Sequence, residues 1–207
     1  MEINTRKTDL LLELGKIDIR ALKSRVNELD ETQWDREEDF AMNYNKHAKS
    51  ALRQTQHIIF RFSNKQVFPY VYQNCSPWEG WKSLLLPILK KATAPYGYTN
   101  GFFSRIMLAK LPAQEFIAPH IDGDERGYAP HKIHIPVQTN DSAYFFLDNQ
   151  RFHLKEGYAY EVNNGTRHAV ANQGNSHRIH LIFEYLNVDE QDEVLKAQIE
   201  LCKGQDE

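Results

Sequence analysis

The stretch KIHIPVQTNDSAYFFLDNQRFHLKEGYAYEV, residues 132–162, decides the fold class. It contains four short runs rich in aromatic and β-branched residues. Turn-forming residues such as Asp148-Asn149 separate these runs. Alternating runs bounded by such turns predict short strands that pair through hairpins. The stretch therefore indicates an antiparallel β architecture.

The same pattern, short aromatic and β-branched runs separated by turn residues, extends from residue 100 to residue 186. We predict eight strands there, at residues 103–111, 115–120, 132–137, 143–148, 151–155, 158–162, 167–171 and 178–186. Eight short strands with close turns favour a barrel or a two-sheet jelly roll over a parallel sheet. We expect a mainly β fold.

The flanking sequence predicts a few further elements. These are a strand at residues 9–17, a helix at 19–29 with Asp18 as its N-cap, a strand at 57–62, a helix at 79–91 that is broken or kinked near Pro87, and a helical tail at 189–203. No repeat or linker divides the chain. We therefore expect one domain over residues 1–207, made of an α/β support segment (1–99), a jelly-roll catalytic core (100–187) and a C-terminal helix (188–207).

Composition limits the classes of partner. The 207 residues carry 25 Lys and Arg against 28 Asp and Glu, a net charge of −3. Without a basic block, a nucleic-acid backbone or an anionic membrane surface is a poor partner. The apolar run at residues 10–12 is too short for a signal peptide or a membrane span. Two distant cysteines, Cys75 and Cys202, suggest a reducing compartment. We expect a cytoplasmic protein.

Histidines gather in the strand region, which holds seven of the nine. His120 and Asp122 are two residues apart at the end of a strand, so both side chains can reach one metal ion. His168, at the opening of the seventh predicted strand, offers a third ligand. Two histidines and one carboxylate suit non-haem Fe(II), but zinc with bound water would use the same residues. The ligand types leave the metal open.

Arg178 begins the last predicted strand. An arginine there could anchor a dicarboxylate cosubstrate through a bidentate contact while the other end of the cosubstrate binds the metal. Along this strand Arg178 shares one face with His180, and the apolar residues occupy the other face. If the amino-terminal helices cover the apolar face, Arg178 and His134 point into the barrel.

The segments HIDGDERGYAPHKIHIPVQTND (120–141) and NNGTRHAVANQGNSHRIHLIF (163–183) resemble the aspartyl/asparaginyl β-hydroxylase family. These enzymes are Fe(II)- and 2-oxoglutarate-dependent oxygenases and include hydroxylases of free amino acids such as proline. The resemblance covers roughly residues 100–186. It rests on the HxD pair, the KIHIP stretch, the later histidine and the arginine ten residues after it.

The resemblance implies a double-stranded β-helix, a cupin-like jelly roll. It implies His120, Asp122 and His168 as iron ligands, Arg178 as the partner of the distal 2-oxoglutarate carboxylate, and His134 as a second polar contact to the cosubstrate. No side-chain general base is needed, because the metal and the cosubstrate carry out the oxidation.

Residues that could contact the substrate are Arg105, Tyr128, His131 and Lys132. Arg105 lies on the strand before the HxD pair, where an inward guanidinium would suit a carboxylate. Tyr128 and His131 belong to the loop after the ligands, which could cover the site. Lys132 stands where many relatives have arginine.

The expected activity is hydroxylation of an amino acid, an amino-acid derivative or a peptidyl residue, with O2 consumed and succinate and CO2 released. Two alternatives remain open. One is a cupin-type metalloenzyme that does not use 2-oxoglutarate, and the other is a non-catalytic jelly roll that only binds a ligand. Arg178 separates the first alternative from the leading hypothesis.

Overall fold

The computed structural model describes residues 9–35, 54–64, 71–122 and 130–204. Strands dominate these ranges. They are β1 (Leu11–Lys16), β2 (Gln56–Asn64), β3 (Val71–Asn74), β4 (Gly101–Leu111), β5 (Phe116–His120), β6 (His131–Gln138), β7 (Ala143–Leu147), β8 (Gln150–Phe152), β9 (Tyr158–Val162), β10 (His168–Asn172) and β11 (Arg178–Asn187).

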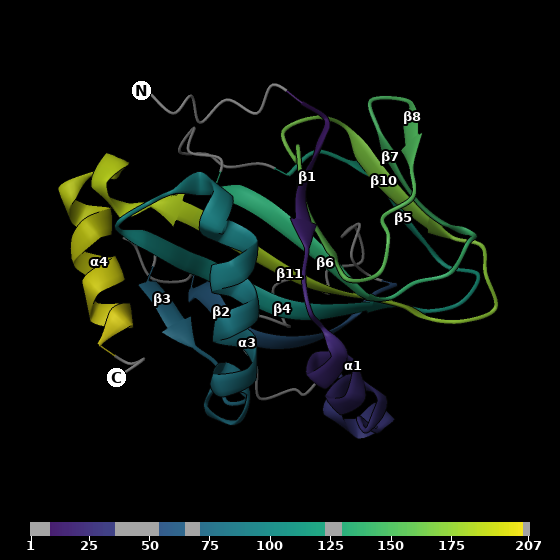
Figure 1. Cartoon of the computed structure of the whole chain (residues 1–207), viewed down its shortest axis with the longest axis horizontal. Coiled ribbons are helices and arrows are strands. Elements are labelled where there is room, and N and C mark those ends of the chain that lie inside the picture. The colour runs from purple at the N-terminus through teal and green to yellow at the C-terminus, as the bar shows by residue number, and fades with distance from the viewer. Residues whose placement is uncertain (1–8, 36–53, 65–70, 123–129, 205–207) are drawn as a thin grey trace.

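The strands form two antiparallel sheets (Figure 1). The larger sheet has the order β1-β9-β6-β11-β4-β2-β3, and the smaller has the order β5-β10-β7-β8. All eight strands predicted between residues 100 and 186 are present, and the mainly β jelly-roll fold is confirmed. Strand β3 was not predicted, because its four residues VYQN lack a clear alternating pattern. Strands β1 and β2, from the amino-terminal half, belong to the larger sheet.

Helices flank the sheets, as predicted. They are α1 (Arg20–Asn27), α3 (Trp78–Thr93) and α4 (Glu193–Lys203), with short 3-10 turns at Glu31–Gln33, Ala94–Tyr96 and Val188–Glu190. Helix α3 continues through Pro87, so Pro87 does not break the helix. Proline removes one backbone donor from a helix interior. Burial of Leu85, Ile88 and Leu89 against the sheet holds this helix together across the gap.

The main hydrophobic core lies between the larger sheet and helices α1 and α3. Figure 1 shows α3 crossing one face of this sheet, with α1 beside it. Ile133 and Leu181 from the sheet are fully buried in one cluster with Leu22 of α1 and Leu89 of α3. The apolar strand faces therefore point toward the helices, as the alternation predicted. The opposite face of the same sheet is free to carry polar side chains into the barrel.

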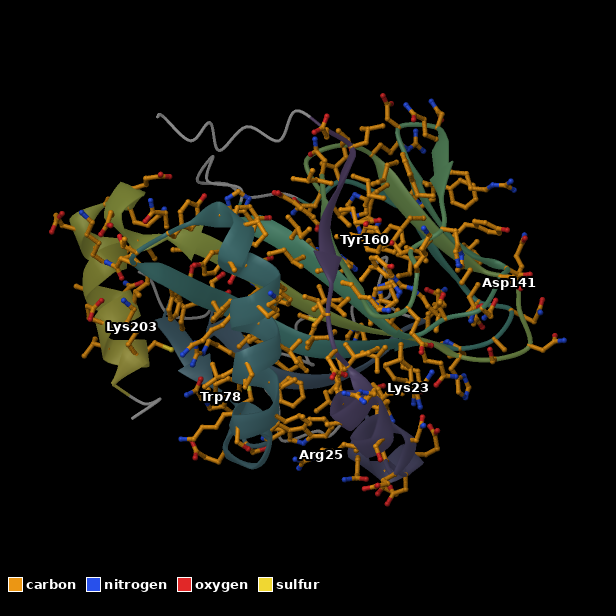
Figure 2. All side chains as sticks on the ribbon, in the orientation of Figure 1. Lys23, Arg25, Trp78, Asp141, Tyr160 and Lys203 are labelled. Atoms are coloured by element: carbon orange, nitrogen blue, oxygen red, sulfur yellow. The ribbon has the colours of Figure 1, made fainter. Side chains whose placement is uncertain are left out.

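A second cluster fills part of the space between the two sheets. It contains Ile117, Phe145 and Leu147 of the smaller sheet and Tyr160 of β9. Figure 2 labels Tyr160, which lies between the sheets and is 4% exposed. This cluster holds the sheets together, and Ile117 and Phe145 also line the polar cavity described below.

The carboxyl-terminal helix packs against the far end of the larger sheet. Leu195, Ile199 and Cys202 of α4 are buried with Tyr72 of β3. Lys203, labelled at the end of α4 in Figure 2, donates to Oδ1 of Asn100 at 2.7 Å, just before β4 begins. Cys75 and Cys202 are buried free thiols. Among the described residues, the helices are all too short or too polar to cross a bilayer.

Candidate metal centre and its cavity

Two neighbouring strands of the smaller sheet bring three potential metal ligands together. His120 is the last residue of β5 and His168 is the first residue of β10, and the two are direct partners in the antiparallel register. The backbone N–H of Asp122 donates to the carbonyl of Asn164 at 3.1 Å, which holds Asp122 beside them. One ligand atom from each of His120, Asp122 and His168, the triad, lies within 4.8 Å of the others.

Both imidazoles are oriented by backbone carbonyls. Nδ1 of His120 lies 2.8 Å from the carbonyl oxygen of Ala118, and Nδ1 of His168 lies 2.9 Å from that of Thr166. A carbonyl only accepts, so each Nδ1 carries a hydrogen, and Nε2 is the ring atom left to bind a metal. The two Nε2 atoms face Oδ1 of Asp122, at 3.5 Å from His120 and 3.8 Å from His168.

The second oxygen of Asp122 is already engaged. Oδ2 accepts from the ammonium of Lys132 and, at 3.3 Å, from the side-chain amide of Asn164. Burial alone would raise the pKa of Asp122, but the Lys132 charge and the hydrogen bonds from His120 and Lys132 hold it well below its usual range. The carboxylate is therefore ionised, with Oδ1 directed to the imidazoles. This donor set, two nitrogens and one anionic oxygen on one side, fits a divalent transition metal.

The pKa values of the two imidazoles shift in opposite directions because their partners differ. Burial lowers the pKa of His168, which keeps its ring neutral and able to bind a metal. The hydrogen bond with Asp122 raises the pKa of His120 despite partial burial. A metal at this position would replace the proton that His120 shares with Asp122.

The triad opens into a cavity of about 230 Å³ between the two sheets. The inner faces of β4, β6 and β11 form one wall, and the smaller sheet forms the other. The lining residues outside the triad are Thr55, His57, Phe62, Arg105, Met107, Ala109, Ile117, Lys132, His134, Phe145, Val162, Asn164, Val170, Arg178, Ile182, Phe183 and Glu184. Together with Asp122 of the triad, five Arg, Lys, Asp and Glu side chains surround the cavity: Arg105, Asp122, Lys132, Arg178 and Glu184. The cavity is thus built for a charged ligand.

Arg178 is the most deeply buried cation in this wall, with 2% exposure. Its Nη2 lies 2.8 Å from Nδ1 of His180, and its guanidinium lies 4.8 Å from the centre of the Phe145 ring. Within the part of the chain that the structure describes, Arg178 has no carboxylate at ion-pair distance. Burial lowers its pKa to about 9. An uncompensated buried cation is costly, so this wall favours an anionic ligand.

His134 also presents an unsatisfied group to the cavity. It is 5% exposed, and no described residue bonds its buried Nδ1. Burial lowers the pKa of His134 well below its usual value, so the ring is neutral. Buried polar atoms normally have partners, which makes a ligand oxygen or an ordered water the fitting partner here. The structure brings Arg178, His134 and the triad to one cavity, as the sequence predicted.

Residues 85–187, about half of the chain, match the family model for aspartyl/asparaginyl beta-hydroxylase. The chain belongs to this family. The match includes both segments on which the resemblance was based. No curated protein sequence matches the chain.

Solved structures with the same fold include enzymes similar to this hydroxylase-family chain. An oxidoreductase of the 2OG-Fe(II) oxygenase family from Burkholderia pseudomallei is 15% identical with TM-score 0.52, over 66% of this chain and 70% of that one. A Pseudomonas putida prolyl-4-hydroxylase is 11% identical with TM-score 0.51, over 86% and 92%. HygX from Streptomyces hygroscopicus, with nickel, 2-oxoglutarate and hygromycin B bound, is 10% identical with TM-score 0.52, over 86% and 83%. At these identities the likeness establishes the fold of the β-hydroxylase family member.

Two of the predicted substrate residues line the cavity in this family member. The Arg105 guanidinium pairs with Glu184 across β4 and β11, at 3.1 Å between Nη1 and Oε1. Lys132 lies opposite Glu184 on β6 and contacts Asp122. Glu184 was not among the predicted site residues, although its position on the Arg178 face of β11 already pointed inward. Tyr128 lies outside the described residues.

The prediction that His131 covers the site is wrong. His131 shares the outer face of β6 with Ile133, because side chains alternate along a strand. Its Nδ1 lies 2.7 Å from a carboxylate oxygen of Glu161, and its Nε2 lies 2.6 Å from the hydroxyl of Tyr98. Tyr96 donates to the other oxygen of Glu161 at 2.8 Å. His131 is thus part of a buried polar network on the helix side of the sheet.

Sequence reasoning also missed the two cavity residues from the amino-terminal half. Thr55 and His57 are 4% and 5% exposed and lie at the start of β2. No motif marks them. The available signal was the position of His57 at the start of a predicted strand of otherwise apolar residues.

Proposed function

We propose that this protein is an Fe(II)- and 2-oxoglutarate-dependent oxygenase that hydroxylates an amino acid, an amino-acid derivative or a peptidyl residue. The observation that carries the proposal is the presence, in one cavity, of a two-histidine, one-carboxylate face and a buried arginine that has no acidic partner among the residues the structure describes. A metal held by three protein ligands keeps positions for a chelating cosubstrate and for O2. A cosubstrate with a second carboxylate would neutralise Arg178.

Each residue has a definable task in this reaction. His120, Asp122 and His168 would hold Fe(II) through Nε2, Oδ1 and Nε2. Arg178 would bind the distal carboxylate of 2-oxoglutarate, and His134 would bond a cosubstrate oxygen. When bound, the metal and 2-oxoglutarate activate O2, and the cosubstrate leaves as succinate and CO2 while the substrate gains a hydroxyl group.

The protein contributes position, charge and exclusion of water. Apolar side chains such as Met107, Ile117 and Val170 surround the polar groups of the cavity and keep bulk water away from them. Six residues along β11 from Arg178, Glu184 pairs with Arg105 of β4 at 3.1 Å and so offers an anion beside a cation. This pair suits a substrate that carries both a carboxylate and an amino group, as amino acids do.

The first test is anaerobic addition of Fe(II) and then 2-oxoglutarate to the metal-free protein, followed by visible absorption spectroscopy. Direct chelation of Fe(II) by the cosubstrate gives a charge-transfer band and requires no substrate. We expect the band in the wild type, its loss in His168→Ala, and a much higher 2-oxoglutarate requirement in Arg178→Ala. Iron binding without a band would favour a cupin-type enzyme that does not use 2-oxoglutarate.

Turnover distinguishes the remaining alternative. Succinate release on adding a panel of amino acids and amino-acid derivatives would identify the substrate class. A protein that binds both iron and 2-oxoglutarate but releases no succinate with any substrate would be a non-catalytic binding protein. The predictions of a cytoplasmic location and of a single domain are part of this proposal, and the two buried free thiols are consistent with a reducing compartment.

A further inference from the structure

Lys132 reaches from the larger sheet to a candidate metal ligand beside the smaller sheet. It lies on the inner face of β6, which it shares with His134, and its ammonium contacts Oδ2 of Asp122, just after β5. In the register of the larger sheet, Lys132 stands opposite Glu184 of β11. Opposite charges at such positions often pair, because their side chains are close. The reach of Lys132 to another sheet therefore needs a reason.

The carboxylate of Glu184 is engaged by two side chains of β4. Its Oε1 accepts from Nη1 of Arg105 at 3.1 Å, and its Oε2 accepts from the hydroxyl of Ser104 at 3.4 Å. Both Glu184 oxygens thus have donors other than Lys132. The Lys132 ammonium is left to the triad, where it bonds the oxygen of Asp122 that does not face the imidazoles.

Three contacts fix the orientation of the Asp122 carboxylate. The backbone N–H of Asp122 donates to the carbonyl of Asn164 at 3.1 Å, and Oδ2 accepts from the Lys132 ammonium and, at 3.3 Å, from the side-chain amide of Asn164. Lys132 belongs to the larger sheet and Asn164 to the turn before β10, so two separate parts of the fold hold Oδ2. The remaining oxygen, Oδ1, faces Nε2 of His120 and of His168.

The number of Asp122 oxygens that bind the metal decides how many coordination positions stay open. A carboxylate can bind a metal ion through one oxygen or through both. If both Asp122 oxygens bound the metal, the second would take a position that a chelating cosubstrate or O2 needs. An ammonium bonded to Oδ2 occupies that oxygen and repels a metal cation from it. Lys132 therefore opposes binding through both oxygens.

We propose that Lys132 is a positioning residue that restricts Asp122 to metal binding through Oδ1 alone and so keeps a coordination position open for O2. This inference rests on the proposed function. It gives Lys132 a task at a metal ligand, whereas the sequence predicted a contact with the substrate. The charge of Lys132 is essential to this task, because an apolar side chain of the same length would leave Oδ2 able to turn to the metal.

The first test observes the binding mode of Asp122 and needs neither 2-oxoglutarate nor substrate. Infrared difference spectra of Fe(II)-loaded minus metal-free protein are recorded with isotope-labelled aspartate, and the bands that Asp122→Asn removes are assigned to Asp122. The separation between the two carboxylate stretches is wide when one oxygen binds a metal and narrow when both bind. The wild type and Lys132→Arg, which keeps a cationic donor, should give the wide separation, and Lys132→Met the narrow one. Lys91→Met, at an exposed lysine of α3, is the control and should match the wild type.

The second test measures whether a position stays open once 2-oxoglutarate is bound. Nitric oxide, a stand-in for O2, is titrated anaerobically into the complex with Fe(II) and 2-oxoglutarate, and its binding is followed by electron paramagnetic resonance. Lys132→Met should keep the charge-transfer band but bind nitric oxide about tenfold to 100-fold more weakly, the range for loss of an outer contact of a metal site. Lys132→Arg and Lys91→Met should stay within about twofold of the wild type.

The inference is overturned if Lys132→Met keeps the wide separation or binds nitric oxide like the wild type, because other contacts would then fix Asp122. It is also overturned if Lys132→Met no longer binds Fe(II) in competition with a chelator, since Lys132 would then hold the whole site together instead of selecting one oxygen. A wild type with the wide separation but no charge-transfer band would overturn the proposed cosubstrate and still support the role of Lys132 in orienting Asp122.

Discussion

His120 and His168 face each other directly across the β5 and β10 pair, with ring centres 4.2 Å apart. The two rings cannot both be charged at this distance without strong repulsion, and the neutral His168 avoids it. Their juxtaposition depends on strand register alone. A slip by one residue would send one ring to the opposite face of the sheet and destroy the site.

Loss of His168 should abolish specific metal binding. His168→Ala removes one of three ligands, and we expect the affinity for Fe(II) or for the stand-in Ni(II) to fall at least 100-fold, more than the loss of an outer contact produces. Competition with a coloured chelator measures this affinity. His177→Ala, which removes an exposed histidine of the same strand region, is the matched control and should bind metal like the wild type.

Replacement of Arg178 by methionine should separate stability from binding. In the absence of 2-oxoglutarate, Arg178→Met removes an uncompensated buried cation, so the free energy of unfolding should stay equal or rise by about 1–3 kcal/mol. The affinity for 2-oxoglutarate should fall at least 100-fold, because hydrogen bonds to charge are lost.

Thermal unfolding with and without 2-oxoglutarate measures both effects for Arg178. The wild type should show a ligand-dependent rise of its unfolding midpoint, and Arg178→Met should not. Arg151→Met, at an exposed arginine, is the control and should keep the full ligand response. A large loss of stability in Arg178→Met without ligand would contradict the inference that the buried Arg178 guanidinium is there to bind an anionic ligand.

His180 should make the protein less stable in mild acid. Burial lowers the pKa of His180 well below the value of about 6.5 in an unfolded chain. The unfolded state therefore binds one more proton as pH falls below about 6.5, and stability decreases by up to about 1.4 kcal/mol per pH unit from this residue. Above about pH 6.5, His180 is neutral in both states, so its contribution to the free energy of unfolding no longer changes with pH.

Urea unfolding of the metal-free protein between pH 5 and 7 tests this linkage. His180→Leu should reduce the slope of stability against pH by close to one proton relative to the wild type. His177→Leu, at an exposed site, should leave the slope unchanged. An unaltered slope in His180→Leu would mean that His180 is protonated in the folded protein, in conflict with its contact to the Arg178 guanidinium.

His131 should matter for stability and not for the reaction. His131→Phe breaks the buried network with Glu161 and Tyr98 and leaves the Glu161 carboxylate without one partner. We expect a loss of about 2–4 kcal/mol in the free energy of unfolding. Metal and 2-oxoglutarate affinities should stay within about twofold, as measured with the same chelator and absorption assays. A change confined to the KM for the substrate would instead indicate that His131 contributes to substrate binding.

The alternation of side chains was the most informative feature of the sequence. It located all eight strands of the jelly roll and placed Arg178 and His134 inside the barrel, because a strand that packs on helices must direct its apolar side toward them. The same rule, applied to His131, would have put that residue with Ile133 on the outer face. The error came from treating the residue as part of a loop when it already belonged to β6.

Other parts of the site could not be derived from pattern. Thr55 and His57 reach the cavity because β2 pairs with β4, a contact between segments that are distant in sequence. Asp35, which accepts from the backbone N–H of His57, adopts a left-handed conformation that no periodicity indicates. The Arg105 and Glu184 pair depends on cross-strand register, which is set by the whole sheet and by an irregularity in β11 just after Glu184.

Strand β5 lies at the edge of the smaller sheet, and β10 is its pairing partner. An edge strand of five residues opens locally at a lower free energy than the centre of a sheet. A metal bound by both His120 and His168 would link β5 to β10. Metal binding should therefore raise the free energy needed for β5 to open locally from the sheet. Amide hydrogen exchange of β5 would then report metal loading without any turnover, and demetallated protein would be attacked first by proteases at this strand.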